Sequence, residues 1–351
     1  MKRSVPIAIL LLATQCFAQW APQNSGTTSS LRGISVVDGK IAWASGTRGT
    51  YLRTTDGGET WTPAQVAGAE TLDFRDVQAF DASTAYLLAA GPGEASRIFK
   101  TTDGGAHWTA QYANHDPKGF LDCMAFWDAQ HGIVVGDPVG GRFTVLLTSD
   151  GGAMWTAVPE RGMPAALDGE GAFAASGTCV AVAEKKYAWF VTGGGAVGRV
   201  FRTSDAGKTW TAVSTPFAAG KEGAGIFSVA FADTDRGVIV GGDYKSPTVA
   251  NANAAWTSDG GKTWKLASEQ PAGYRSAVAV VPNTQWPTMI AVGTTGSDYS
   301  IDGGRTWKHL AEGNFNAVAF AAPDAGYAVG PQGTIVRVAG SAPGGKRPSL
   351  K

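Results

Sequence analysis

Arginine and polar side chains recur at the starts of short apolar segments, where they could bind a ligand. Arg32, Arg75 and Arg275 occupy the second position of three such segments, and Asp122 and Asn316 occupy the matching position in two more. A guanidinium donates two parallel hydrogen bonds to a carboxylate. Three arginines at matching positions therefore suit an acidic ligand, such as a carboxylated sugar.

Carboxylates also stand where the second apolar segment of a repeat ends, and one precedes the segment "GAFAASG". Asp137 lies in "GDP", Asp243 and Tyr244 in "GGDY", Asp298 in "TTGSD", and Glu170 just before residue 171. Paired acids are what glycoside hydrolysis requires, so Asp137, Glu170 and Asp243 are the candidate catalytic residues if the chain is an enzyme. The alternative is that the arginines and acids form ion pairs between repeats. The predicted ligand-binding face comprises Arg32, Arg75, Asp122, Asp137, Glu170, Asp243, Tyr244, Arg275 and Asp298.

A repeated phrase indicates which elements position these residues. The stretch "TSDGGKTWK" at 257–265 has five further copies, spaced about 43–55 residues apart, and a period of this size indicates a solenoid or a propeller. Two apolar runs and a strand such as "TYLRT" precede the phrase, and its Trp opens another strand. Four antiparallel strands per repeat without a helix predict propeller blades. The six aspartates are Asp56, Asp103, Asp150, Asp205, Asp259 and Asp302.

The phrase itself is predicted to be structural. Asp-Gly favours a tight hairpin, because glycine adopts positive φ without steric cost and the carboxylate accepts hydrogen bonds from backbone N–H groups just downstream. The phrase would join the third and fourth strands of a blade. The candidate face, built from starts of first strands and ends of second strands, lies at the opposite end.

Seven innermost strands are expected, although the phrase occurs six times. They are predicted at 31–37, 74–80, 121–127, 171–177, 226–232, 274–280 and 315–321. The last repeat lacks the phrase, and "WAPQ" at 20–23 resembles "WTPAQ" at 61–65, which opens a fourth strand. The sequence therefore predicts an all-β, seven-bladed propeller over residues 19–340, closed by an N-terminal strand that leaves no open sheet edge.

The motif S/T-x-D-x-G-x-T-W resembles the Asp box, or bacterial neuraminidase repeat. The motif is found in sialidases, some glucanases, sortilin-type receptors and photosystem II stability/assembly factors. A single exported ring most resembles the last family over nearly the whole mature chain. This resemblance implies a scaffold that binds a protein or peptide partner on the face opposite the Asp boxes.

A sialidase-like or other glycoside hydrolase, with a carbohydrate ligand, is the alternative. "SLRGIS" lacks the F/Y-R-I-P signature of sialidases, and the glucanases of this type resemble two tandem propellers. The pattern "GGGAVG" at 193–198 precedes a strand rather than a helix, so no cofactor is expected. The four scattered histidines do not predict a metal site.

The N-terminus is predicted to be a secretory signal peptide over residues 1–18, with Lys2 and Arg3 before an apolar run. We expect an exported, periplasmic or extracellular monomer without a membrane span, ending in a flexible tail at 341–351. Basic and acidic residues number 29 each, which does not indicate nucleic-acid binding. Cys123 and Cys179 could form a disulfide, or could be two small buried side chains.

Overall fold

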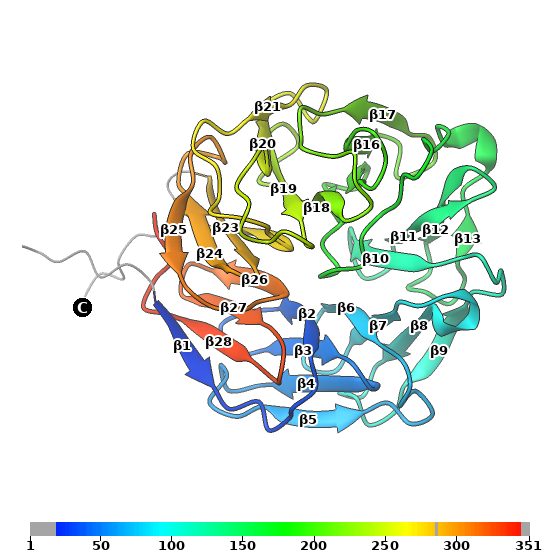
Figure 1. The fold of residues 1–351 in the computed structure, drawn as a ribbon. Coiled ribbons are helices and arrows are strands. Elements are labelled where there is room, and N and C mark those ends of the chain that lie inside the picture. Colours follow the sequence, from blue (N-terminus) through cyan, green and yellow to red (C-terminus); the bar gives the residue numbers. More distant parts are fainter. Residues whose placement is uncertain (1–18, 285–286, 345–351) are drawn as a thin grey trace, which may run out of the picture.

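Seven four-stranded antiparallel sheets surround a central axis in the computed structural model, which describes residues 19–284 and 287–344 (Figure 1). The prediction of an all-β, seven-bladed propeller is confirmed. The predicted signal peptide and residues 345–351 of the predicted tail lie outside the described residues. Earlier in that tail, Ala342 is buried and its N–H donates to the carbonyl of Pro323. No helix in the described part of the chain is long and apolar enough to cross a membrane.

The first three blades each follow the chain outward from an inner strand. Blade 1 comprises β2 (Leu31–Val36), β3 (Ala42–Gly46), β4 (Thr50–Thr54) and β5 (Thr62–Gln65). Blade 2 comprises β6 (Phe74–Ala79), β7 (Ala85–Ala89), β8 (Arg97–Thr101) and β9 (Thr109–Ala113), with the short 3₁₀ helix η1 (Gly93–Ala95). Blade 3 comprises β10 (Leu121–Phe126), β11 (Gly132–Val139), β12 (Arg142–Thr148) and β13 (Thr156–Ala157), followed by the 3₁₀ helix η2 (Glu160–Gly162).

Blades 4 to 6 repeat this order. Blade 4 comprises β14 (Val180–Ala183), β15 (Tyr187–Val191), β16 (Arg199–Thr203) and β17 (Thr211–Ser214). Blade 5 comprises β18 (Ala224–Phe231), β19 (Gly237–Asp243), β20 (Ala254–Thr257) and β21 (Lys265–Leu266). Blade 6 comprises β22 (Ala277–Val281), β23 (Thr288–Gly293), β24 (Gly296–Ser300) and β25 (Lys308–Ala311).

Blade 7 joins the two ends of the described chain. It comprises β26 (Ala317–Ala322), β27 (Ala325–Val329), β28 (Ile335–Ala339) and, as its outer strand, β1 (Gln19–Gln23). The antiparallel pairs between β1 and β28 run from Gln19–Ala339 to Gln23–Ile335. Figure 1 shows these two strands side by side, in blue and red. The predicted closure by residues 20–23 is confirmed.

Six of the predicted inner strands overlap β2, β6, β10, β18, β22 and β26, but the fourth is wrong. Blade 4 begins at Val180, and residues 171–177, the predicted strand, instead belong to the long connection from β13 to β14. "GAFAASG" has the small and apolar composition of a buried strand. Its Gly177, at a φ of 74°, adopts a left-handed conformation that a regular strand does not contain.

All six Asp-box turns share one set of hydrogen bonds, including the fourth, where Ala206 follows Asp205 in place of glycine. In blade 1, Thr54 Oγ1 donates to Asp56 Oδ1 at 2.8 Å, and the N–H of Thr60 donates to the same oxygen at 3.0 Å. The N–H of Gly57 donates to the carbonyl of Lys40, in the hairpin between the first and second strands. The turn therefore lies at the same end of the blade as that hairpin, and the starts of the inner strands lie at the other end.

Aromatic side chains attach these turns to the neighbouring blade. The hydroxyl of Tyr51 donates to the carbonyl of Gly105 at 2.8 Å, and that of Tyr86 donates to Gly151 at 2.7 Å. In blade 4 the indole of Trp189 donates to Gly260 at 2.9 Å. The turns thus hold both the hairpin within a blade and the contact between blades.

Replacing Asp259 with alanine should lower stability and leave ligand binding unchanged. Asp259 accepts hydrogen bonds from the N–H groups of Lys262 and Thr263 and from the hydroxyl of Thr263. Losing a turn acceptor of this kind costs about 1 kcal/mol. Thermal melting and a binding assay on the same variant test this, with Asp259→Asn as the control that keeps one acceptor oxygen. A normal melt combined with lost binding would instead place the turns in the functional site.

Candidate functional site

Residues from several blades meet at the mouth of the ring, at the end opposite the Asp-Gly turns. The pairing of the first and second strands is interrupted by a bulge at Arg32, Arg75, Asp122 and Phe227. A bulge re-aims the side chain that it contains and is common beside functional sites. Three of these four residues were predicted to occupy matching positions, and the shared bulge is the backbone feature that makes them equivalent.

Arg275 is not equivalent to Arg32 and Arg75, contrary to the predicted alignment. The N–H of Arg275, in blade 6, donates to the carbonyl of Gly241, in the preceding blade. In the same way, the N–H of Leu31, in blade 1, donates to the carbonyl of Gly330, in the blade that precedes it around the ring. Arg275 therefore corresponds to Leu31, and Ser276 corresponds to Arg32. Successive strand side chains point to opposite faces, so this shift by one residue directs Arg275 into the protein interior.

Arg275 is fully buried and paired with Asp298. Its Nε and Nη2 each lie 2.5 Å from Asp298 Oδ2, and Nη1 donates to the carbonyl of Tyr274 and to Thr295 Oγ1. These contacts remove two residues of the predicted face from the mouth. The pair is a structural one, but it joins two residues of blade 6, whereas the alternative interpretation expected pairs between blades.

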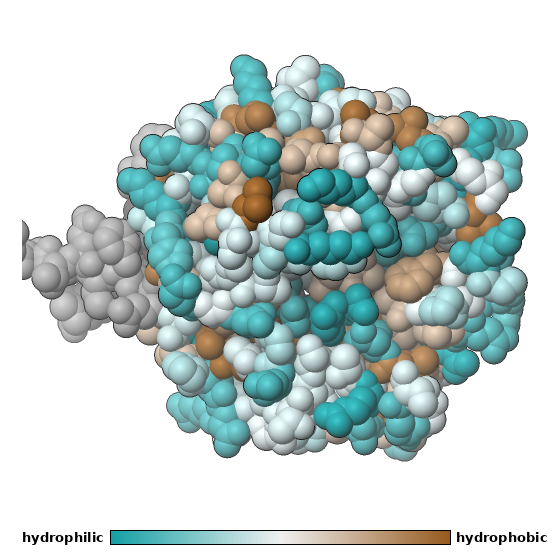
Figure 2. All heavy atoms as spheres, viewed as in Figure 1, coloured by the Kyte–Doolittle hydropathy of each residue, from teal (hydrophilic) through white to brown (hydrophobic). Residues whose placement is uncertain are grey.

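A pocket of about 360 Å³ occupies the mouth. Among its residues are Arg32, Arg75 and Tyr244 of the predicted face, and Asn316 of the predicted alignment. The pocket lining is completed by Phe173, Ala174, Ala175, Phe227, Tyr274, Ser276 and Thr294. The face drawn in Figure 2 is hollowed near its centre, and its apolar patches are small and separated by hydrophilic groups. A larger cavity of about 640 Å³ lies beside the turn of Asp302, whose carboxylate is engaged in turn hydrogen bonds.

The two arginines of the pocket differ in how far they are neutralised. Arg75 Nε donates to Asp73 Oδ2 at 2.6 Å, and Nη1 donates to the carbonyl of Ala174 at 2.7 Å. Within the described residues, Arg32 Nε is buried without a hydrogen-bond partner. Burial and the nearby charge of Arg75 lower the pKa of Arg32. The pocket thus holds a partly desolvated cation with an unused donor, which an anionic group would satisfy.

Aromatic rings form the apolar part of the same pocket. Phe173 stacks on Phe227 with ring centroids 3.9 Å apart and an interplanar angle of 7°. Tyr274 meets the edge of Phe227 at 4.8 Å, and Tyr244 approaches the same ring at 6.2 Å. Tyr244 is half exposed, so its ring is available to a ligand above the mouth. Rings beside cations suit a segment that carries both apolar and acidic groups.

Residues 171–178, which we call the mouth segment, form one wall of the pocket. The segment lies where other blades begin their inner strands, and Phe173, Ala174 and Ala175 line the pocket. Ser176 Oγ donates to the carbonyl of Ser276 at 2.9 Å, across the ring from blade 4 to blade 6. These residues were predicted to form a strand, so their contribution to the pocket was not expected. The sequence signal for an irregular backbone is Gly177, a glycine inside an apparent strand.

Most acids of the predicted face have partners within the protein. Glu170 is buried against Arg199, with Arg199 Nε 2.8 Å from Glu170 Oε1, and Thr192 also donates to Oε1. Asp137 Oδ1 accepts the N–H of Ala172 at 2.9 Å. Asp243 accepts the N–H of Lys245 and lies 3.8 Å from Lys221 Nζ. The three candidate catalytic acids are thus bound to the protein's own groups.

Asp122 is the exception among these acids. Its side chain is buried, and within the described residues its Oδ2 has no hydrogen-bond partner. Burial, and to a lesser extent the charge of Asp137, raise the pKa of Asp122 well above its ordinary value. Burial thus favours the neutral form of this carboxyl over its charged form.

Comparison with known proteins identifies the family. A family model described as "Photosynthesis system II assembly factor YCF48" matches residues 12–111 and 74–225, more than half of the chain. The chain belongs to this family. Among curated proteins, none matches the sequence.

Solved structures of YCF48 proteins share the fold. YCF48 from Cyanidioschyzon merolae aligns with a TM-score of 0.64 and 19% identity, over 91% of this chain and 98% of that one. The structure described as "YCF48 bound to D1 peptide" aligns with a TM-score of 0.61 and 19% identity, over 91% of this chain and 96% of that one. A third solved structure, described as "Structure of U3-55K", aligns with a TM-score of 0.60 at 12% identity, over 92% of this chain and 98% of that one. At these identities the similarity shows the fold alone.

Proposed function

We propose that this YCF48-family protein is a binding scaffold that holds an acidic peptide segment of a partner protein in the mouth pocket. In this proposal the protein is exported to a periplasmic or extracellular compartment and acts as a monomer. The ligand places a carboxylate on Arg32 and Arg75 and packs its apolar side chains against Tyr244 and Phe173.

One observation carries the proposal: Arg32 is a half-buried residue of the pocket wall, and its buried Nε has no hydrogen-bond partner among the described residues. A buried donor without a partner costs about 1–3 kcal/mol, and a carboxylate that reaches Arg32 recovers this cost on binding. Arg75 adds a second cation in the same pocket, and its partners Asp73 and Ala174 hold it in place. The pocket is thus preorganised for an anion.

The comparison supports a peptide ligand rather than a sugar. A YCF48 protein of the same fold has been solved with a D1 peptide. The glycosidase alternative needs free carboxylates, whereas Glu170, Asp137 and Asp243 are engaged by Arg199, Ala172 and Lys245. Hydrolysis of an aryl glycoside by the wild type, lost in Glu170→Gln, would replace the scaffold proposal with an enzyme.

Binding of short peptides with a free C-terminal carboxylate, compared with their amidated forms, tests the proposal. The double variant Arg32→Ala and Arg75→Ala should weaken binding of the free-carboxylate form at least 100-fold. Each charge-assisted hydrogen bond contributes about 1.5–3 kcal/mol, and tenfold in affinity is about 1.4 kcal/mol. Arg236→Ala is the matched control, since Arg236 pairs with Asp233 at the other end of the ring. Equal binding by the double variant and this control would refute the proposal.

A further inference from the structure

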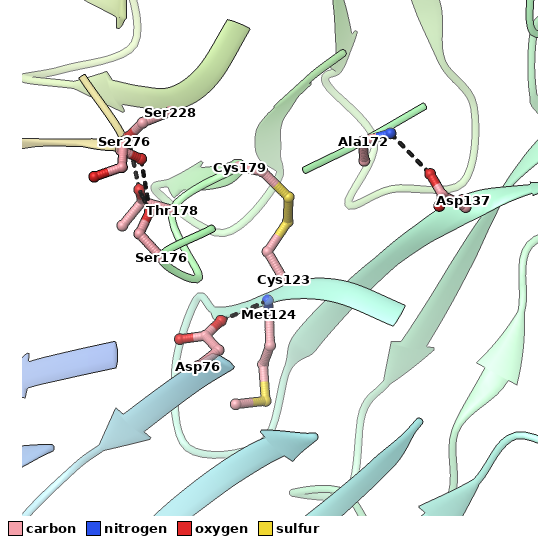
Figure 3. Close-up of a disulfide and its surroundings, with 10 residues drawn as sticks. All are labelled: Asp76, Cys123, Met124, Asp137, Ala172, Ser176, Thr178, Cys179, Ser228 and Ser276. Atoms are coloured by element: carbon pink, nitrogen blue, oxygen red, sulfur yellow. Dashed lines mark hydrogen bonds between the residues drawn. A yellow bond between two sulfur atoms is a disulfide. The ribbon is translucent and has the colours of Figure 1, made fainter. Parts of the chain in front are cut away.

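A disulfide joins β10, the inner strand of blade 3, to the residue directly before β14, the inner strand of blade 4, immediately beside the mouth segment. Cys123 and Cys179 are bonded, with their Cα atoms 5.8 Å apart, and both are fully buried. The open question of the sequence analysis, whether the two cysteines pair, is thereby answered. Cys123 lies in β10 and follows the bulged Asp122, and Cys179 directly follows the mouth segment. Figure 3 shows the disulfide with Ser176 and Thr178 on one side of it and the hydrogen-bonded Asp137 and Ala172 on the other.

The two ends of the mouth segment are held in different ways. At the N-terminal end, Gly171 and Gly193 exchange backbone hydrogen bonds, and the N–H of Ala172 donates to Asp137. At the C-terminal end the segment has the Ser176–Ser276 bond and a 2.6 Å contact between Thr178 Oγ1 and Ser228 Oγ. Among the described residues, the Cys123–Cys179 disulfide is the only covalent cross-link between this end of the segment and another blade.

Regular pairing between β14 and β15 begins only at Val180, so the mouth segment does not belong to the ladder of blade 4. Between and beside its two ends, the segment is held by non-covalent contacts. These are the Arg75–Ala174 hydrogen bond, the Phe173–Phe227 stack and the N–H of Val229, which donates to the carbonyl of Thr178. Glycine is required at 177, because a Cβ there would lie 2.3 Å from Asp76 Oδ1. Glycine leaves the unfolded chain more conformational freedom than any other residue. A covalent anchor at Cys179 therefore contributes strongly to the position of the segment.

We infer that the Cys123–Cys179 disulfide is a positioning bond for the mouth pocket, so that the protein becomes able to bind its ligand only once this bond has formed. The bond fixes the segment that carries Phe173 and the carbonyl of Ala174, and that carbonyl in turn holds Arg75 at 2.7 Å. Without the bond, Arg75 loses a fixed partner and Phe227 loses the ring that stacks on it. The inference rests on the proposed function for its binding readout, but not for its structural readout.

Formation of the bond must accompany folding, because neither sulfur is exposed in the folded protein. With a small-molecule disulfide such as glutathione disulfide as the oxidant, one cysteine thiolate attacks a glutathione sulfur and releases one glutathione thiolate. The second cysteine thiolate then attacks the protein sulfur of the mixed disulfide and releases the other. The two cysteines lose two protons and two electrons, and glutathione disulfide gains them. Binding competence would thus be acquired in an oxidising compartment.

The test compares the wild type with the double variant Cys123→Ala and Cys179→Ala. Amide hydrogen exchange of residues 171–178, read by mass spectrometry, should become at least tenfold faster in the variant. Affinity for the free-carboxylate peptide should fall at least tenfold. Val134→Ala is the matched control, because Val134 is fully buried in β11 and packs in another cluster, so it lowers the melting temperature without touching the segment. This control should leave both the exchange and the affinity unchanged.

Three outcomes overturn the inference. The first is unchanged exchange of residues 171–178 in the alanine variant. The second is unchanged affinity despite faster exchange. The third is an equal effect of Val134→Ala, which would make the bond a general stabiliser only. If the wild type does not bind the peptide, the proposed function fails, while the exchange of residues 171–178 still tests the positioning role. Should the double variant not fold, the single variant Cys123→Ala, which also lacks the bond, replaces it in the exchange measurement.

Discussion

Replacing Arg275 with alanine should lower the free energy of unfolding by about 3–5 kcal/mol, the typical cost of removing one partner of a buried ion pair. Asp298 would be left buried with an uncompensated charge, and the carbonyl of Tyr274 and Thr295 would each lose a donor. Since Arg275 does not line the mouth pocket, ligand affinity per folded molecule should be unchanged. Urea denaturation at pH 7 measures the loss.

A double variant separates two effects: the loss of the ion pair, and the cost of leaving the charge of Asp298 buried without a partner. In Arg275→Met with Asp298→Asn, both charges are absent, so stability should recover part of what Arg275→Met alone loses. Arg75→Ala is the comparison, since Arg75 is part-exposed and its removal should affect binding more than melting. If Arg275→Ala melts like the wild type but no longer binds the peptide, Arg275 acts on the ligand face as the sequence suggested.

Stability should fall as the pH rises from about 4 to about 8, in part because of Asp76. The Asp76 carboxyl is buried beside Gly177 and accepts the N–H of Met124 at 2.8 Å (Figure 3). Burial raises the pKa of Asp76 from 3.8 to about 8. In this window the folded protein keeps a proton that the unfolded chain has lost. Folding therefore takes up a proton, which becomes more costly by up to about 1.4 kcal/mol per pH unit.

The variant Asp76→Asn isolates this contribution, because the amide imitates the protonated carboxyl and does not titrate. Urea unfolding of both proteins at pH 5, 6, 7, 8 and 9 gives the difference in their stabilities. The free energy of unfolding of the variant should rise relative to that of the wild type by about 1 kcal/mol per pH unit up to pH 8. Above pH 8 the difference between the two proteins should stay constant. Asp122 and Asp137, whose pKa values burial also raises, are present in both proteins and cancel in the difference. Parallel pH profiles would show that Asp76 is ionised in the folded protein.

The architecture could be predicted from the sequence because each repeat carries its own turn chemistry. Asp-Gly pairs fix the hairpins locally, and their spacing fixes the number of strands between them. The missing seventh copy was recoverable because "WAPQ" resembles "WTPAQ", and β1 occupies the expected place. These inferences depend on local residue preferences and counting, which tertiary contacts do not overturn.

The candidate site was less predictable because it depends on register and on an irregular segment. Arg275 occupies the second position of its predicted segment, but its backbone hydrogen bond makes it equivalent to Leu31, the first position in blade 1, and a slip of one residue reverses the side-chain direction. Asp76 stands between apolar residues in "FRDVQAF" and was not selected, because a buried carboxyl is visible only once its neighbours are known. Phe173 and Tyr274 reach the pocket through contacts between blades that no repeat pattern encodes.

The pairing of β1 with β28 sets the order in which the chain can complete its fold. The strand that leaves the ribosome first among the described residues is the partner of the strand that leaves nearly last. Until β28 has been made, β1 has no neighbouring strand, and the ring cannot close. A permuted gene that begins between two blades and links residue 344 to residue 19 would encode blade 7 without interruption. Such a chain would still close only when its last blade meets its first, but this contact would join two complete blades rather than two strands of one sheet.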